Sequence, residues 1–259
     1  MFFGEDLMDS HRFYVTGLSE IGSGSEIELN EYISRQIIRV LRMRTGDSIK
    51  LFDGSGTEWE AKIVGINGTS VQVAFCNVFN PNVESKTRLN LCPALVSSDR
   101  LEFVFQKGSE LGVASFSPVI SERVQKKDLN PSHEKIKRWN RIIIEACEQS
   151  GRVKIPAISP AMNLLDVVSI RAEIEPVVIL WEMEKETGII ETLRKFISKV
   201  PDSITLIIGP VGGFSHLEIN QSLELGAKVV GLGSRVLRSE TAAIVASSII
   251  MAELDQLGG

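Results

Sequence analysis

Short apolar runs separated by turn residues dominate the first third of the chain. The runs are rich in valine, isoleucine and aromatic residues, a composition typical of strands. They are HRFYV at 11–15, SIKLF at 48–52, EWEAKIVGI at 58–66 and TSVQVAF at 69–75. One helical pattern interrupts them over residues 31–43, with Ile33, Ile37, Val40 and Leu41 expected on its inner face. We therefore expect residues 1–76 to form a small β-barrel with one helix.

The pattern changes after residues 77–88, a polar stretch with a proline and no periodicity that is typical of a linker. From residue 89 to 259, apolar runs alternate with amphipathic segments. The expected strands are 89–96, 115–120, 177–182, 204–209 and 228–233, and the expected helices are 99–111, 134–150, 187–199, 216–225 and 239–257. This alternation predicts an α/β domain with a mostly parallel sheet that helices cover on both faces.

One loop in this domain has the sequence of a ligand site. In TLIIGPVGGFS (205–215) an apolar run ends at Gly209-Pro210, and Ser215 with Glu218 forms a capping box that begins a helix. Open α/β sheets bind ligands at such strand-to-helix loops. The loop has neither the lysine of a phosphate-binding P-loop nor the G-x-G-x-x-G spacing of a dinucleotide site. It therefore holds an uncharged part of a ligand, or it only turns the chain.

Composition narrows the function classes. No apolar run approaches the roughly 20 residues that span a bilayer. The start MFFGEDLMDS is acidic where a secretory signal would be basic. We therefore expect a cytoplasmic protein without a membrane partner. The three cysteines are widely spaced and only three histidines occur, so we expect neither a metal nor a disulfide. Each cysteine is expected to be a small core residue.

Basic residues form two islands although the formal net charge is −5. Five basic residues and one acidic residue lie from Arg35 to Lys50, and seven basic and two acidic residues lie from Arg123 to Arg141. On the expected first helix Arg35, Arg39 and Arg42 share a face. Such islands can contact a phosphate backbone, or they are solvated surface; the sequence alone leaves both readings open.

Four motifs together are specific enough to suggest a family. They are KGSELGV at 107–113, EACEQSGR at 145–152, IGPVGGFS at 208–215 and LGSRVLRSETA at 232–242. The set resembles the knotted, SPOUT-type RNA methyltransferases, and within them the bacterial family that methylates N3 of a uridine in 16S ribosomal RNA. The resemblance extends over nearly the whole chain, because the β-rich module is similar to that family's PUA-like RNA-binding domain.

The resemblance implies a trefoil knot in residues 89–259 whose loops bind S-adenosylmethionine. It also implies small-subunit ribosomal RNA or the assembled subunit as partner, and a homodimer built on the last helix through Ala243, Ile244, Ser247, Ser248, Met251 and Leu254. The implied cofactor-binding residues are Leu180, Glu182, Gly209, Pro210, Gly212, Gly213, Leu232, Gly233, Val236, Leu237, Thr241 and Ala242.

Charged residues near these motifs are the candidates for chemistry and RNA binding. Arg235 and Arg238 flank the last motif and are expected to stabilise a uracil anion or a nucleotide phosphate. Glu240 is a candidate proton acceptor or orienting group, or a carboxylate favoured by a helix N-terminus. The expected RNA-binding residues are Arg12, Arg39, Arg42 and Arg152, the last with helix capping as its alternative.

One residue departs from the family motif. The family usually has G-P-E-G-G where this chain has Gly209-Pro210-Val211-Gly212-Gly213. If the missing carboxylate orients the target base, turnover is reduced; if it only caps or shapes the loop, valine is tolerated. The alternative function is therefore a catalytically silent RNA-binding or ribosome-assembly factor that keeps the fold.

Overall fold

The computed structural model describes residues 11–18, 21–22, 24–195 and 200–254. It consists of two compact units, each considered by itself. The first comprises Met1–Glu84 with Cys147–Ile155, and the second comprises Ser85–Ala146 with Pro156–Gly259. The alternation of apolar runs gave no indication that residues 147–155 join the first unit.

The first unit is a five-stranded sheet curled around one core. Its strands are β1 (Arg12–Tyr14), β2 (Glu26–Glu28), β3 (Ser48–Phe52), β4 (Glu58–Asn67) and β5 (Ser70–Phe79), in the order β1-β3-β4-β5-β2. The β1–β3 pair is parallel and the other pairs are antiparallel. Alternate residues such as Ile49, Leu51, Ile63 and Val73 are buried because successive strand side chains point to opposite faces.

The expected helix over 31–43 is shorter and irregular. α1 (Glu31–Arg35) continues as the π-helix η2 (Gln36–Leu41), and Arg42 ends it in a left-handed conformation with φ of 53°. Ile33 and Ile37 are buried as expected, but Val40 is 72% exposed and its predicted inward position was wrong. The wider i→i+5 winding changes the direction of every side chain after Arg35, which a 3.6-residue period cannot anticipate.

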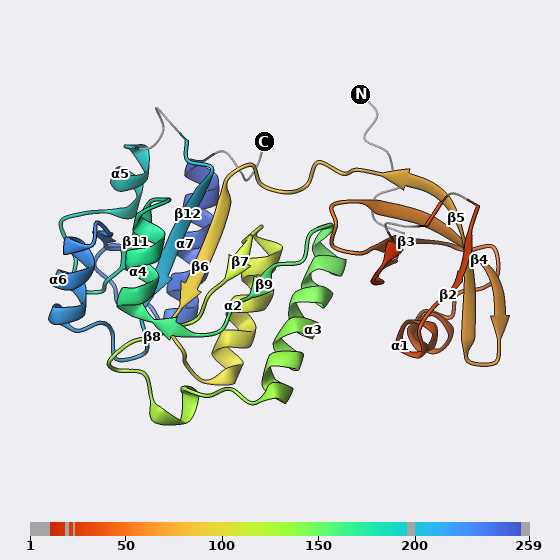
Figure 1. The fold of residues 1–259 in the computed structure, drawn as a ribbon, viewed down its shortest axis with the longest axis horizontal. Helices are drawn as coiled ribbons and strands as arrows, with labels where there is room; N and C mark the ends of the chain where they lie inside the picture. Colours follow the sequence, from red (N-terminus) through yellow and green to blue (C-terminus); the bar gives the residue numbers. More distant parts are fainter. Residues whose placement is uncertain (1–10, 19–20, 23, 196–199, 255–259) are drawn as a thin grey trace. The chain divides into compact units, whose positions relative to one another are not determined.

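The second unit is an α/β fold around a six-stranded sheet (Figure 1). Its strands are β6 (Arg88–Pro93), β7 (Ser115–Phe116), β9 (Ala157–Ile158), β11 (Val177–Leu180), β12 (Ser203–Ile208) and β13 (Lys228–Val230). The order is β13-β11-β12-β6-β7-β9, and every pair is parallel. A separate parallel pair joins β8 (Val119–Ile120) to β10 (Met162–Asn163).

Helices cover both faces of this sheet, as the alternating pattern predicted. On one face α2 (Ser98–Glu110) and α5 (Ile189–Arg194) pack against α7 (Ser239–Glu253), which also contacts β6 and β12. On the other face α4 (Leu164–Ala172) and α6 (His216–Glu224) pack together and against β11 and β13. The 3₁₀ turn η3 (Lys126–Asp128) precedes α3 (His133–Ser150), whose last turn belongs to the first unit.

The cysteines fit the expectation in two of three positions. Cys92 and Cys147 are buried, and Cys76 is half-buried; none forms a disulfide. Burial raises the pKa of Cys92 to about 12 and that of Cys147 to about 11. Both thiols therefore stay protonated at neutral pH, as core residues rather than nucleophiles.

Candidate active site

Three neighbouring strands end at one cavity. β11, β12 and β13 are adjacent and parallel, so their carboxyl ends lie at the same edge of the sheet. The loops that follow them line a cavity of about 410 Å³. It includes eleven of the twelve residues expected to bind a cofactor: Leu180, Glu182, Gly209, Pro210, Gly212, Gly213, Leu232, Gly233, Val236, Leu237 and Ala242. Thr241 is the exception; it is exposed on α7 and does not line the cavity.

The glycine-rich loop after β12 has a fixed shape. Ser215 Oγ accepts a hydrogen bond from the Glu218 amide at 3.2 Å, and Glu218 Oε2 accepts one from the Ser215 amide at 2.8 Å, which forms the predicted capping box. Gly213 has φ of +68° and donates to the Pro210 carbonyl at 3.0 Å. A side chain at Gly213 would overlap the Glu182 carboxylate. Glycine is therefore required here both by backbone conformation and by space.

The loop after β11 is held in shape by hydrogen bonds to the carboxylate of Glu184, one of its own residues. Glu184 Oε1 accepts hydrogen bonds from the amides of Glu186 and Thr187, both at 2.8 Å. These two backbone donors lower the pKa of Glu184. The Thr187 carbonyl accepts a hydrogen bond from the Gly231 amide at 2.9 Å, which joins this loop to the end of β13.

The cavity combines apolar walls with four charged groups. Leu180, Ile208 and Val230 are buried strand ends at its base. Glu182 supplies one carboxylate, and Arg100, Arg235 and Arg238 supply three guanidinium groups. The structure thus brings the two predicted catalytic arginines to the same cavity as the predicted cofactor-binding residues. Sequence reasoning missed Arg100, although it lies in the first turn of α2, shortly after the carboxyl end of β6.

Glu240 has a different place from the one expected. It does not line the cavity, and its Oε2 lies 3.8 Å from Arg100 Nε. That oxygen is buried and has no hydrogen-bond partner among the described residues. Arg100, in contrast, does line the cavity. Of the two roles expected for Glu240, this contact with Arg100 fits the orienting role better than the proton-acceptor role, and its function stays a prediction.

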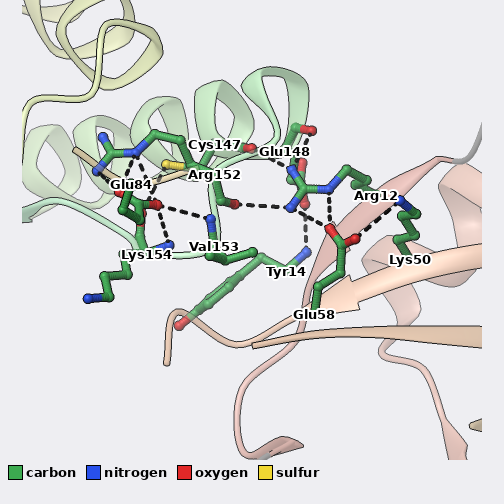
Figure 2. Close-up of polar contacts among 10 residues, drawn as sticks. All are labelled: Arg12, Tyr14, Lys50, Glu58, Glu84, Cys147, Glu148, Arg152, Val153 and Lys154. Carbon is green, nitrogen blue, oxygen red and sulfur yellow. Dashed lines mark hydrogen bonds and ion pairs between the residues drawn. The ribbon is translucent and has the colours of Figure 1, made fainter. Parts of the chain in front are cut away.

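Arg12 is committed to contacts inside the first unit (Figure 2). Its Nη2 lies 2.7 Å from Glu58 Oε2, and both side chains are nearly buried. Its Nη1 donates to the carbonyls of Cys147 and Glu148, at 2.9 and 3.2 Å, and its Nη2 donates to the carbonyl of Arg152 at 3.1 Å. The expected RNA contact is therefore corrected: this guanidinium caps the last turn of α3.

Arg152 is also buried. Its Nη2 lies 2.7 Å from Glu84 Oε2, with 6% of the Arg152 side chain exposed. Glu84 Oε1 accepts further hydrogen bonds from the amides of Val153 and Lys154, at 3.1 and 3.0 Å (Figure 2). The prediction that Arg152 binds RNA is therefore wrong in this structure, because the pair fixes the segment after α3 to the barrel. Arg39 and Arg42 are both exposed, and their role in RNA binding stays a prediction.

Two negative findings apply to the described part of the chain. None of its helices is long and apolar enough to cross a membrane. No group of three or more His, Cys, Asp or Glu side chains in that part could hold a metal ion.

Comparisons with known proteins agree over both units. A family profile described as "RNA methyltransferase domain" matches residues 83–251, and one described as "RNA methyltransferase PUA domain" matches residues 37–76. The protein named "Ribosomal RNA small subunit methyltransferase E" of Bacillus subtilis is 30% identical over 226 residues, which cover 86% of this chain and 88% of that protein. The protein of the same name from Rickettsia conorii is 31% identical, with 92% and 94% covered.

Solved structures give the same result. A Legionella pneumophila protein described as a methyltransferase, in complex with "the bound cofactor SAM", has a TM-score of 0.82 and 36% identity, with 94% of this chain and 97% of that chain covered. The ribosomal RNA small subunit methyltransferase E of Neisseria gonorrhoeae, bound to S-adenosyl methionine, has a TM-score of 0.81 and 28% identity at the same coverage. The architecture expected for the two modules is confirmed; the threading of the knot stays a prediction.

Proposed function

The chain belongs to the RNA methyltransferase family that includes the ribosomal RNA small subunit methyltransferases E, and from this membership we propose that it transfers a methyl group from S-adenosylmethionine to N3 of a uridine in 16S ribosomal RNA. The observation that carries the proposal is the cavity at the ends of β11, β12 and β13, which is lined by the glycine loop and has no phosphate-binding lysine.

The cavity residues fit S-adenosylmethionine. The adenine ring is flat and largely apolar, and it matches Leu180, Ile208 and Leu237 together with the exposed backbone of the two glycine loops. The methionine part carries an ammonium, a carboxylate and a sulfonium. Glu182 is the anion of the cavity for the positive groups, and the arginines can pair with the carboxylate. When bound, the cofactor supplies an electrophilic methyl group on sulfur.

The chain's own contribution to the reaction is positioning and electrostatics. N3 of uracil becomes a nucleophile as it loses its proton, and negative charge then spreads to the two ring carbonyl oxygens. Fixed guanidinium groups beside the methyl position stabilise that charge. Arg235 and Arg238 line the cavity and are suited to this role, or to holding the phosphate of a flipped nucleotide.

The barrel unit supplies the rest of the RNA contact in this proposal. Arg35, Arg39, Arg42 and Arg44 are exposed around the end of the first helix. Contacts to phosphate position an RNA without reading its sequence. We therefore propose that these arginines bind the phosphate backbone of 16S ribosomal RNA or of the assembled small subunit. The place of action in this proposal is the cytoplasm, where subunits are made.

A homodimer remains part of the proposal, with a corrected surface. Of the six residues expected at the dimer contact, Ala243, Ser247, Met251 and Leu254 are buried in the chain's own fold. They were assigned to a partner because a helix with small and apolar residues on several sides gives no sign of which side meets its own sheet. The contact proposed now uses the partly exposed side of α7, with Ile244, Val245 and Ser248. A monomeric mass by light scattering at micromolar concentration would contradict it.

A methyl-transfer assay tests the function. Purified protein is incubated with S-adenosylmethionine labelled in the methyl group and with small ribosomal subunits from a strain that lacks this modification. We expect label in the RNA of small subunits and none in large subunits. A silent assembly factor, for which the only argument is the apolar Val211, would bind the subunits and leave the RNA unlabelled.

A further inference from the structure

A second cavity, of about 450 Å³, adjoins the cofactor cavity. Both cavities are lined by Pro210, Val211, Gly212 and Arg100, so the two cavities meet at the glycine loop. Methyl transfer needs the nucleophile and the methyl carbon about 3–3.5 Å apart in the reacting complex. A ring bound where the second cavity meets the first would lie next to a donor bound in the first cavity.

The lining of the second cavity suits a planar heterocycle with a polar edge. Leu95 and Val96, shortly after the end of β6, are buried apolar residues that can contact a ring face. The polar residues are Arg100, Arg123, Gln125 and Asp128. Uracil presents two carbonyl oxygens as acceptors and one N–H as a donor between them. Guanidinium and amide N–H groups match the oxygens, and the carboxylate matches the N–H.

The two arginines of this cavity are anchored. Arg123 Nη1 donates to the Gly212 carbonyl at 2.7 Å, which holds its guanidinium against the glycine loop. Arg100 Nε lies 3.8 Å from Oε2 of the half-buried Glu240. Their positive charge therefore lies beside the glycine loop, at the end of the second cavity that adjoins the first, where the negative charge of a deprotonated ring would develop. Preorganised charge of this kind makes the largest contribution to the rate enhancement of many enzymes.

Asp128 is the acidic residue in the polar lining of the second cavity. It is the last residue of η3, half-buried, and its amide donates to the Gln125 carbonyl at 2.9 Å, which fixes its backbone. Among the side chains that the structure describes, which leave out that of Lys127, none forms a hydrogen bond or an ion pair with its carboxylate. The charged groups that share its cavity are Arg100 and Arg123. It is the one carboxylate in this lining, since Glu240 faces Arg100 from outside the cavity.

We propose that this second cavity receives the uracil ring of the target nucleotide and that Asp128 accepts its N3 proton. This inference rests on the proposed function. The N3–H bond breaks and the proton passes to the Asp128 carboxylate; the N3 lone pair forms the new bond to the methyl carbon. The bond from that carbon to sulfur breaks, and its electron pair leaves the sulfur as a neutral thioether. Asp128 then releases the proton to solvent.

The first test compares Asp128→Asn with Glu122→Gln, an exposed carboxylate of the same loop that lines neither cavity. Removing a general base lowers a rate by 10²–10⁴-fold, so we expect D128N to lower the single-turnover rate at pH 7 about 100-fold. The variant's rate should rise with pH, because hydroxide then removes the proton. Calorimetric affinity for S-adenosylmethionine should stay unchanged. A D128N rate within threefold of the wild-type rate would overturn the inference.

The second test locates the bound uracil ring without relying on turnover. Small subunits are assembled with 4-thiouridine at the methylated position and irradiated with the wild-type protein. We expect the crosslinked peptides to contain residues 95–100 or 123–128. Crosslinks confined to residues 232–242 would overturn the inference and leave the proposed function intact. A wild-type protein that transfers no methyl group would overturn the proposed function, and this inference with it.

Discussion

Arg12 and Arg152 show why single arginines are hard to assign from a sequence. Both were predicted to bind RNA, yet each is buried against a carboxylate, Glu58 or Glu84. Those partners lie 46 and 68 positions away in the chain, so only the folded structure shows that the charge is used internally. Arg39, which the same reasoning selected, is exposed.

Replacing Arg12 with alanine should destabilise the protein and leave RNA contacts intact. The change leaves Glu58 with Lys50 as its remaining ion-pair partner among the described residues, and it removes donors from the carbonyls of Cys147, Glu148 and Arg152. Breaking a buried pair from one side costs about 3–5 kcal/mol, so we expect about 3 kcal/mol less unfolding free energy in urea. Arg39→Ala, at an exposed site, is the control and should change it little. If R12A were as stable as wild type but bound RNA more weakly, the assignment would be wrong.

Gly213 offers a sharp test of the cofactor cavity. Gly213→Ala forces a side chain into a left-handed conformation and toward the Glu182 carboxylate. We expect calorimetric affinity for S-adenosylmethionine to fall at least tenfold, because the loop must move. Gly226→Ala is the matched control: its φ is +95°, it lies outside the cavity, and its nearest neighbour would be Ala172 at 3.9 Å. Equal loss of affinity in both variants would mean that the loss reflects general destabilisation.

At the scale of elements, the period of a helix could be predicted but its irregularity could not. The capping box at Ser215 and the buried strands β11 and β12 follow directly from local sequence. The π-helical turn of η2 and the short helix α4 do not. α4 has no side-chain cap at its first turn, and its mixed faces give no clear period.

The exposed arginines beside η2 should carry part of the RNA affinity. Replacing Arg39 and Arg42 with alanine removes two phosphate contacts, and each contact contributes about 0.7–0.9 to the slope of log affinity against log salt concentration. We expect the slope to fall by about 1.5 while affinity for S-adenosylmethionine is unchanged. Lys62→Ala, an exposed cation on β4, is the control. Normal RNA binding by R39A/R42A at every salt concentration would make this face a solvated surface only.

The pair between α2 and α3 should contribute a pH-dependent part of stability. Arg138 donates two hydrogen bonds of 2.9 Å to Glu102, and this pairing holds the pKa of Glu102 below 4.5. A carboxylate with a lowered pKa stabilises the fold above its unfolded pKa, and the stabilisation is lost as pH falls through the folded value. Glu102→Gln should therefore lower Tm slightly at pH 7, with the difference vanishing toward pH 3. Glu134→Gln, in a more exposed pair, is the control and should change Tm less at either pH. A Tm difference between E102Q and wild type that persisted at pH 3 would contradict the account.

At the scale of the whole molecule, the order of strands and helices predicted the fold class. Eleven of the twelve residues expected to bind the cofactor line one cavity, and their binding role stays a prediction. What the sequence could not provide were relations across long separations. The inclusion of Cys147–Ile155 in the first unit, the contact of Arg100 with Glu240, and the second cavity all join segments that are far apart in the chain. Such contacts depend on tertiary packing, which local patterns do not encode.

The central claim is that this chain methylates N3 of a uridine. The most direct measurement is mass spectrometry of nucleosides from small-subunit RNA, prepared without the modification and incubated with the protein and S-adenosylmethionine. The account predicts a new N3-methyluridine peak that, at a limiting concentration of S-adenosylmethionine, is at least about tenfold smaller when the protein carries Gly213→Ala. Methylation of a ribose or of another base, or subunits that bind the protein and gain no methyl group, would contradict it.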